Sequence, residues 1–410
     1  MKLTVVGSGP AGLYSALTAS EQGAKVTLVD RSERLGGTCV LFGCIPSKAM
    51  MSPLFLSYAS QKYGKSVEFS YSELEEFARS VVQRVSKGVE YMLESAGVEV
   101  VKGEAKLNSG KIEVGGQILE SDSVIVATGT EKPQIPGTIA SDDLHFLDRE
   151  FNTVLLVGGG VGGVEYGWLL HLAKKKVTIV EREELLLPGH DRDLRASVTS
   201  HFKRLGIDVR TNSVAEISDK VKINGGLEDF DLVVFTFGRK PAVKGFENLV
   251  GNKWIGVNEY METKINHVYA AGDVTGTFTA HEAIHKGIIA GLNATGTRRS
   301  YRGEGVPKVL YTHPEIAYVG NIDGKCVKLS MAEVVRAVAE RSTEGFIKVC
   351  VNEDGTLRGG VAFGERAEDI VSTLSLLIQL HVKVKDAKEL MFPHPSYLEG
   401  LWEALRRLKP

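Results

Sequence analysis

The sequence has little that would place the protein in a membrane or against a polyanion. Its unbroken apolar stretches are only as long as a strand, well short of the roughly 18 apolar residues that a membrane-spanning helix needs. The 49 lysines and arginines nearly balance the 51 aspartates and glutamates, so that the formal net charge is -2. A balanced chain lacks the electrostatic basis for binding nucleic acid or anionic lipid. We therefore expect no membrane and no nucleic-acid partner.

Cysteine is also scarce, with four in 410 residues. In a reducing compartment, two cysteines close in sequence are more often catalytic or metal-binding than a structural disulfide. The first strand pattern begins by Leu3, which leaves no room for a secretory signal, so we expect a cytoplasmic protein. Cys326 and Cys350 lie 24 residues apart in different predicted elements. They match no ligand or redox pattern, and we expect them to be core residues.

Glycine, by contrast, is abundant. The 45 glycines are about 11% of the chain against a usual share of roughly 7%, and glycine lets a backbone approach a ligand closely. The chain is too long for a single hydrophobic core, so roughly two to four domains are expected. Gly-rich cofactor loops are therefore the first expectation.

One pattern of strand, glycine-rich turn, helix and strand occurs twice, over residues 3–29 and 154–180. This pattern predicts an α/β protein with two Rossmann-like nucleotide-binding domains. Alternating strands followed by helices after residue 300 predict a C-terminal α+β domain. The expected domains are 1–136 (first nucleotide domain), 137–240 (second nucleotide domain), 241–299 (return to the first sheet through a strand at 268–271) and 300–410 (C-terminal domain).

Each repeat carries the G-x-G-x-x-G fingerprint of a dinucleotide site. The first fingerprint is Gly7, Gly9 and Gly12, and the second is Gly158, Gly160 and Gly163. Such glycines let backbone N–H groups approach a pyrophosphate at a helix N-terminus. Asp30 and Glu181 each follow the last glycine by eighteen residues, and each can hydrogen-bond a ribose hydroxyl.

Two dinucleotide sites in one chain suit one cofactor that is held and one that exchanges, which points to FAD and a nicotinamide. The pattern alone does not assign which site takes which. Because a carboxylate repels a 2′-phosphate, Glu181 favours NAD(H) over NADP(H), whereas the neighbouring Arg182 opposes that preference.

Cys39 and Cys44 lie in the segment GGTCVLFGCIPSK. Pro46 and Ser47 are compatible with a helix that opens immediately after Cys44, and a thiol at a helix N-terminus has a lowered pKa that favours thiol–disulfide exchange. A zinc half-site, a structural disulfide and two buried thiols are the alternatives. Zinc would need a second ligand pair, and a disulfide closing so short a loop contributes only about 2 kcal/mol. We therefore favour a redox pair, and no metal.

Five ordered motifs resemble those of the pyridine nucleotide–disulfide oxidoreductases. They are GSGPAG from residue 7, GGTCVLFGCIPSK from residue 36, ATGT from residue 127, AAGDVTG from residue 270 and HPSYLE from residue 394. The resemblance covers nearly the whole chain. It implies an FAD- and NAD-dependent oxidoreductase that forms a homodimer through its C-terminal interface domain.

The resemblance also implies roles for individual residues. Cys39 matches the thiol that attacks the substrate, and Cys44 the thiol that lies against the flavin. Lys48 and Glu165 match a pair beside the flavin, where a cation can stabilise charge on the reduced ring.

His394 and Glu399 match a His–Glu pair that the partner subunit contributes to a shared active site. An imidazole can take a proton from a dithiol while the carboxylate orients it. Ser396 and Glu399 also form S-x-x-E, a capping box that needs no catalysis.

The remaining matched positions would bind the two cofactors. For FAD they are Gly7, Gly9, Pro10, Ala11, Gly12, Asp30, Gly37, Thr38, Lys48, Thr128, Gly129, Asp273, Ala280 and His281. For NAD they are Gly158, Gly160, Val161, Gly163, Glu181 and Gly238. Within the family, Glu181, Val161 and the Ala280–His281 pair point to oxidation of dihydrolipoamide, free or on a lipoyl-bearing acyltransferase. Reduction of another small disulfide, or a flavin-based NADH oxidase or quinone reductase, is the alternative.

Overall fold

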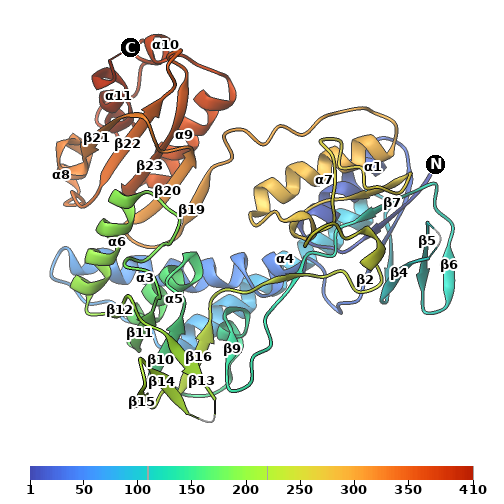
Figure 1. Cartoon of the computed structure of the whole chain (residues 1–410), viewed down its shortest axis with the longest axis horizontal. Helices are drawn as coiled ribbons and strands as arrows, with labels where there is room; N and C mark the ends of the chain where they lie inside the picture. The colour runs from blue at the N-terminus through green and yellow to red at the C-terminus, as the bar shows by residue number, and fades with distance from the viewer. Residues whose placement is uncertain (109, 219, 410) are drawn as a thin grey trace.

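The computed structural model describes residues 1–108, 110–218 and 220–409. Three five-stranded sheets organise the chain (Figure 1). Two are parallel and carry the glycine-rich turns, and the third is antiparallel and C-terminal.

The first sheet is built from segments far apart in the sequence. Its strands, in spatial order, are β18 (Val268–Ala270), β7 (Ser123–Val126), β1 (Lys2–Val6), β2 (Lys25–Asp30) and β3 (Glu99–Lys102). β18 pairs in parallel with β7, so the strand expected near residue 268 does return to this sheet. The helices of this unit are α1 (Pro10–Glu21), α2 (Gly37–Leu41), α3 (Cys44–Gln61), α4 (Tyr71–Ser95), η3 (Asp273–Thr275) and α7 (Ala280–Ala294).

The second sheet repeats the same construction around the second fingerprint. Its strands are β12 (Asp208–Arg210), β11 (Lys176–Val180), β10 (Thr153–Val157), β16 (Leu232–Phe235) and β9 (Ile139–Ala140). Leu155 and Leu156 of its central strand have no exposed surface, as expected for a parallel strand covered on both faces. The helices of this unit are η1 (Ser141–Phe146), α5 (Val161–Leu172) and α6 (Arg192–Leu205).

Small antiparallel sheets flank the two parallel ones. They are β4 (Ala105–Asn108), β5 (Lys111–Val114) and β6 (Gln117–Leu119); β13 (Ala215–Ile217), β14 (Val221–Ile223) and β15 (Gly226–Glu228); and β8 (Thr130–Glu131) with β17 (Lys240–Pro241). The β8–β17 pair joins the two chain crossings between the parallel sheets. A short helix, η2 (Glu247–Leu249), follows the second crossing.

The third sheet forms a separate C-terminal unit at the end of the molecule opposite β4–β6 (Figure 1). Its order is β19 (Lys308–Leu310), β20 (Glu315–Gly320), β23 (Leu357–Gly364), β22 (Phe346–Val351) and β21 (Lys325–Ser330), all antiparallel. Its helices are η4 (Met331–Glu333), α8 (Val335–Ala339), α9 (Ala367–Gln379), α10 (Val384–Ala387) and α11 (Leu398–Arg407).

The expectation for Cys326 and Cys350 is corrected in part. Cys350 is buried as expected, but Cys326 is partly exposed, and the two form a disulfide with sulfurs 2.01 Å apart. They are register partners on β21 and β22, and their Cα atoms are 4.1 Å apart. The chain between them passes through η4 and α8 before it returns as β22. Their proximity depends on strand register, which the spacing in the sequence does not reveal.

One helical segment, residues 37–61, is apolar and long enough to cross a membrane by length and composition. Glycine, serine and Lys48 interrupt it, so a search for unbroken apolar runs overlooks it. It consists of α2 and α3, in which Met50, Met51 and Leu54 have no exposed surface. Such packing is typical of an interior helix of a folded protein, which meets the same length and composition criteria.

Helices α1 and α7 pack so closely that only glycine fits between them. A Cβ atom on Gly287 would lie 2.3 Å from the carbonyl oxygen of Ala11, and one on Gly291 would lie 2.8 Å from that of Ser15. The Ser15 hydroxyl donates a hydrogen bond to the Gly287 carbonyl at 3.0 Å. This contact fixes the N-terminus of α1, where the first fingerprint lies.

We predict that Gly287→Ala destabilises the protein by about 1–3 kcal/mol, because the added methyl group meets rigid backbone. Gly88→Ala is the matched control, since Gly88 is an exposed position of α4 with open space around its Cα. It should stabilise by about 0.5–1 kcal/mol. Urea unfolding measures both, and equal stability of the Gly287→Ala and wild-type proteins would contradict the close packing.

Candidate active site

A cavity of about 840 Å³ lies at the carboxyl ends of the first sheet. Gly7, Asp30, Ala127 and Gly272, at or just after the ends of β1, β2, β7 and β18, all line it. Ligands of parallel α/β sheets bind at this edge. All the positions expected to bind FAD line this cavity except Gly12 and His281.

The cavity wall fits a dinucleotide at its glycine-rich turn. Gly9 precedes α1 and no side chain caps that helix, so its first backbone N–H groups are available to a pyrophosphate. Gly37 has φ +61°, and a Cβ there would lie 2.6 Å from the Cα of Gly9. Gly12 instead packs inward, because a Cβ there would lie 1.8 Å from the carbonyl oxygen of Gly7.

The acid after each fingerprint hydrogen-bonds to its own glycine-rich turn. Asp30 accepts a bond from the Ser8 N–H at 2.7 Å, and Glu181 accepts one from the Gly159 N–H at 2.8 Å. Glu181 also accepts from the Glu183 N–H at 2.9 Å and is 5% exposed. Both acids thus order their turns, and their contact with a ribose stays a prediction.

The second fingerprint lies outside this cavity. Gly158, Gly160, Gly163 and Glu181 do not line it, whereas Val161 and Gly238 do. Gly160 precedes α5, which has no side-chain cap either. The second turn therefore offers unpaired N–H groups beside, not within, the main cavity.

The cysteine pair lines the cavity, with Cys39 in α2 and Cys44 as the first residue of α3. Both are free thiols. A hydrogen bond from Cys39 and the nearby Lys48 ammonium, acting against burial, lower the pKa of Cys44 to about 7, while the same hydrogen bond and burial raise the pKa of Cys39. Cys44 is thus the thiol that ionises first, as expected at a helix N-terminus.

Lys48 and Glu165 join this pair to the second nucleotide unit. The Lys48 ammonium lies 3.1 and 3.2 Å from the two carboxylate oxygens of Glu165. Glu165 also accepts a hydrogen bond from the Tyr311 N–H at 2.8 Å, and the ammonium lies 4.5 Å from the centre of the Tyr311 ring. Lys48 and Glu165, which the family resemblance pairs, are therefore in contact in the structure. Tyr311 contacts both of them and was not predicted from the sequence.

Two polar contacts, one buried and one partly buried, were not predicted from the sequence. The Tyr166 hydroxyl lies 3.1 Å from Nε2 of His145, and burial lowers the pKa of His145 to about 4. Arg239 binds both carboxylate oxygens of Asp142, at 2.9 and 2.8 Å. Tyr166, Asp142 and Arg239 line the cavity, and only the Gly238 turn, next to Arg239, hinted at the second contact.

Asp273 lies at the start of η3 on the cavity wall. Burial raises the pKa of Asp273 to about 6, against the opposing charge of Arg239. A carboxylate in this position can accept hydrogen bonds from the hydroxyls of a bound cofactor. His281 lies outside the cavity, with Nε2 2.8 Å from the Pro307 carbonyl oxygen.

His394 and Glu399 form a contact of their own, away from the cavity. Nδ1 of His394 lies 2.8 Å from Glu399, whose other carboxylate oxygen accepts the Ser396 N–H at 2.8 Å. Although burial opposes it, these two bonds lower the pKa of Glu399. The His394 side chain is 68% exposed, so its Nε2 is free to face another molecule. Glu399 therefore orients His394 and also closes half of the capping box.

Together, a dinucleotide cavity, an ionisable cysteine pair on its wall and a second glycine-rich turn beside it define a two-nucleotide oxidoreductase with a reactive dithiol. Residues 1–287 match the family model for pyridine nucleotide-disulphide oxidoreductases, and residues 306–405 match the dimerisation domain of that family. The chain belongs to this family. The assignment confirms the fold class and the NAD-dependent, FAD-containing enzyme class expected from the sequence.

Individual relatives agree with the family match over the full chain. The dihydrolipoyl dehydrogenase of Bacillus subtilis is 29% identical, covering 99% of this chain and 98% of the relative. That of Staphylococcus aureus is 31% identical, covering 98% and 95%. The crystal structure of LpdA from Mycobacterium tuberculosis superposes with a TM-score of 0.91 at 25% identity, covering 100% of both chains.

We predict that Lys48→Gln raises the pKa of Cys44 above about 7, because the thiolate loses a neighbouring cation. Less Cys44 is then ionised at neutral pH, and its alkylation profile against pH should shift upward by about half a unit to one unit. Peptide mass spectrometry of the reduced protein measures this shift. Lys62→Gln, at the residue that follows α3, is the control and should leave the Cys44 alkylation profile unchanged. Overlapping Lys48→Gln and wild-type profiles would contradict the effect of Lys48 on the pKa of Cys44.

Proposed function

We propose that the protein is a dihydrolipoyl dehydrogenase that oxidises dihydrolipoamide, free or attached to an acyltransferase, with NAD⁺ as acceptor. The observation that carries the proposal is the Cys39–Cys44 pair, in which one thiol is strongly acidified on the wall of a dinucleotide cavity. The relatives from Bacillus subtilis and Staphylococcus aureus bear this name. They support the substrate class, a small dithiol and its cyclic disulfide.

The proposed reaction begins with the cysteine pair oxidised. A substrate thiolate attacks the sulfur of Cys39, which forms a mixed disulfide and releases Cys44 as a thiolate. The second substrate thiol then displaces Cys39, so the product leaves as a cyclic disulfide and the cysteine pair keeps two electrons. Cys44 leaves as a thiolate beside the Lys48 ammonium, whose charge lowers the pKa of the Cys44 thiol.

Bound FAD would supply the two-electron relay from this dithiol to NAD⁺. The residues that would hold it are those of the cavity wall, from the Gly7–Gly12 turn and Asp30 to Asp273. Lys48, held by Glu165, would place a positive charge beside the reduced flavin ring. Val161, which is 40% exposed on the cavity wall, and the second turn would admit NAD⁺.

Proton transfer is assigned to His394 of the partner subunit in a homodimer. Within one chain, His394 does not line the cavity, yet its Nε2 is exposed and its Nδ1 is held by Glu399. This arrangement suits a base that accepts a proton from a substrate thiol on another molecule. The match to a family dimerisation domain over residues 306–405 supports the dimer.

We also propose the four segments 1–136, 137–240, 241–299 and 300–410 as the FAD, NAD, returning FAD and interface domains. The division is supported by the strands of the three five-stranded sheets, which fall within these segments. A cytoplasmic location is proposed with them, since a reducing compartment keeps an exchangeable cysteine pair in use.

Cys44→Ser should abolish oxidation of dihydrolipoamide by NAD⁺, by at least about a thousandfold, because the dithiol can no longer form. Direct reduction of a quinone by NADH should survive, since it does not require the cysteines. Steady-state assays of both activities test this. Unchanged dihydrolipoamide oxidation in the variant would refute the proposal, and a wild-type protein that reduces another small disulfide but ignores dihydrolipoamide would refute the substrate alone.

Mixing subunits tests the shared site. Cys44→Ser and His394→Ala homodimers should each be nearly inactive, the second by about 10²–10⁴-fold. A dimer with one subunit of each kind has one intact site, so random re-association should restore about a quarter of wild-type turnover. Mixtures that stay inactive after subunit exchange would place all the catalytic groups within one chain.

A further inference from the structure

The Cys326–Cys350 disulfide lies apart from the cavity. Neither cysteine lines the cavity, and both belong to the C-terminal sheet rather than to the first sheet. Groups bound in the cavity therefore do not exchange electrons with this disulfide by contact. Its redox state must be set by a separate reaction.

The two cysteines differ in their exposure to solvent. Cys350 has no exposed surface, whereas Cys326 is partly exposed on β21, which is an edge strand with β22 as its neighbour. We therefore expect a thiolate from solution to attack at the more exposed Cys326 rather than at the buried Cys350. Access at one sulfur is sufficient for thiol–disulfide exchange, since the attack needs only one of the two.

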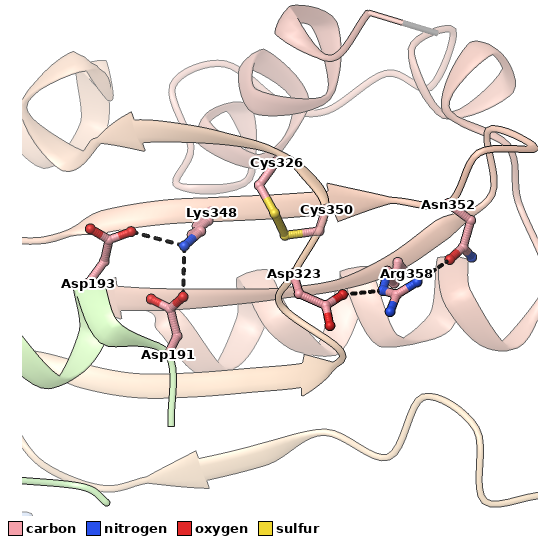
Figure 2. The surroundings of a disulfide bond; sticks show 8 residues. All are labelled: Asp191, Asp193, Asp323, Cys326, Lys348, Cys350, Asn352 and Arg358. Carbon is pink, nitrogen blue, oxygen red and sulfur yellow. Dashed lines mark hydrogen bonds and ion pairs between the residues drawn. A yellow bond between two sulfur atoms is a disulfide. The ribbon is translucent and has the colours of Figure 1, made fainter. Parts of the chain in front are cut away.

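The disulfide shares a face of the sheet with an ionic clamp. Lys328 and Lys348 are register partners two positions along from the cysteines, so all four side chains project from the same face. Lys348 binds Asp191 at 2.7 Å and Asp193 at 2.9 Å, at the start of α6 (Figure 2). Lys328 binds Asp193 at 3.0 Å. The clamp thus ties this face to the second nucleotide unit.

Two lysines directly opposite one another destabilise the pairing of their strands. Asp191 and Asp193, at the start of α6, offset that repulsion. The disulfide joins β21 to β22 at the next residue pair on the same face. On the other face of these strands α11 packs closely, since a Cβ on Gly400 would lie 2.6 Å from Ile347. Gly400 is the neighbour of Glu399, which holds His394. The β21–β22 pair therefore supports both the clamp, through Lys328 and Lys348, and helix α11, through Ile347.

We propose that Cys326–Cys350 is a second thiol–disulfide exchange site, opened by dithiols, whose closure locks β21 onto β22 between the α6 clamp and α11. A dithiol thiolate attacks Cys326, and Cys350 leaves as a thiolate and takes up a proton. The second thiol of the reagent then displaces Cys326, so the reagent ends as a cyclic disulfide and the protein gains two electrons and two protons. This proposal does not depend on the reaction assigned to Cys39 and Cys44.

The test uses the FAD-loaded Cys39→Ser/Cys44→Ser protein, in which only the second pair can respond. This double variant, kept folded, is incubated with increasing concentrations of dithiothreitol. It is then quenched with iodoacetamide and digested for mass spectrometry. Cys326 and Cys350 should be unlabelled before reduction. After reduction, Cys326 should be labelled without denaturant, whereas the buried Cys350 should be labelled only when the protein is unfolded for digestion. The melting temperature should fall by about 5 °C on reduction, as estimated from the closed loop, and return on reoxidation.

Cys326→Ser in the same background is the matched control. It should melt near the temperature of the reduced protein and should not respond to dithiothreitol. Three outcomes would overturn the proposal: either cysteine labelled before reduction, labelling of Cys326 that requires denaturant, or equal melting temperatures of the reduced and oxidised protein. The first would remove the disulfide, the second would make it a closed structural link, and the third would remove the lock.

Discussion

The ion pair between Lys48 and Glu165 is the contact on which the arrangement of the site depends. Lys48 belongs to α3, which begins at Cys44, and Glu165 belongs to α5, which follows the second glycine-rich turn. Tyr311, just after β19 of the third sheet, donates its N–H to the same carboxylate. One carboxylate thus ties the cysteine helix, the second nucleotide helix and the C-terminal unit together. Removing either charge would leave the other, on a largely buried side chain, without its counter-charge.

The same contact links position to chemistry. Lys48 lowers the pKa of Cys44, after the larger effect of the hydrogen bond from Cys39. Because Glu165 and Tyr311 hold the ammonium in place, its distance from the sulfur is fixed by packing rather than by a flexible side chain. A cation held in advance costs no reorganisation when a thiolate forms. The fold therefore determines which of two chemically identical residues ionises.

Features encoded locally could be predicted from the sequence. The turn at Gly7–Gly12 and the helix that opens at Cys44 each depend on a few neighbouring residues, and the structure contains both. Of the capping box predicted from Ser396 and Glu399, only the half supplied by Glu399 forms, because no side-chain hydroxyl caps α11. The pairing of Lys48 with Glu165 needed the family resemblance, because 117 residues separate the two. The capping interpretation and the histidine-orienting interpretation of Glu399 did not compete, since its two oxygens serve one partner each.

Features set by tertiary register could not be predicted. The contacts of His145 with Tyr166, of Arg239 with Asp142 and of Cys326 with Cys350 all join elements whose alignment no local pattern specifies. The cysteines show the limit most clearly. A spacing of 24 residues argued against a pair, yet an antiparallel return through α8 brings the two opposite one another.

The exposure of His394 follows from the way in which the third sheet is attached to the second nucleotide unit. A base buried beside its own cysteines would need the third sheet to fold over the cavity, but the Glu165–Tyr311 contact and the clamp at Asp191 hold that sheet against the second unit instead. His394 is left on an outer surface, with one nitrogen fixed by Glu399 and the other free. A group so carefully oriented, yet facing no residue of its own chain's cavity, is explained if a second molecule supplies what it acts on. The contacts that make one chain rigid thus also keep His394 away from the cavity of its own chain.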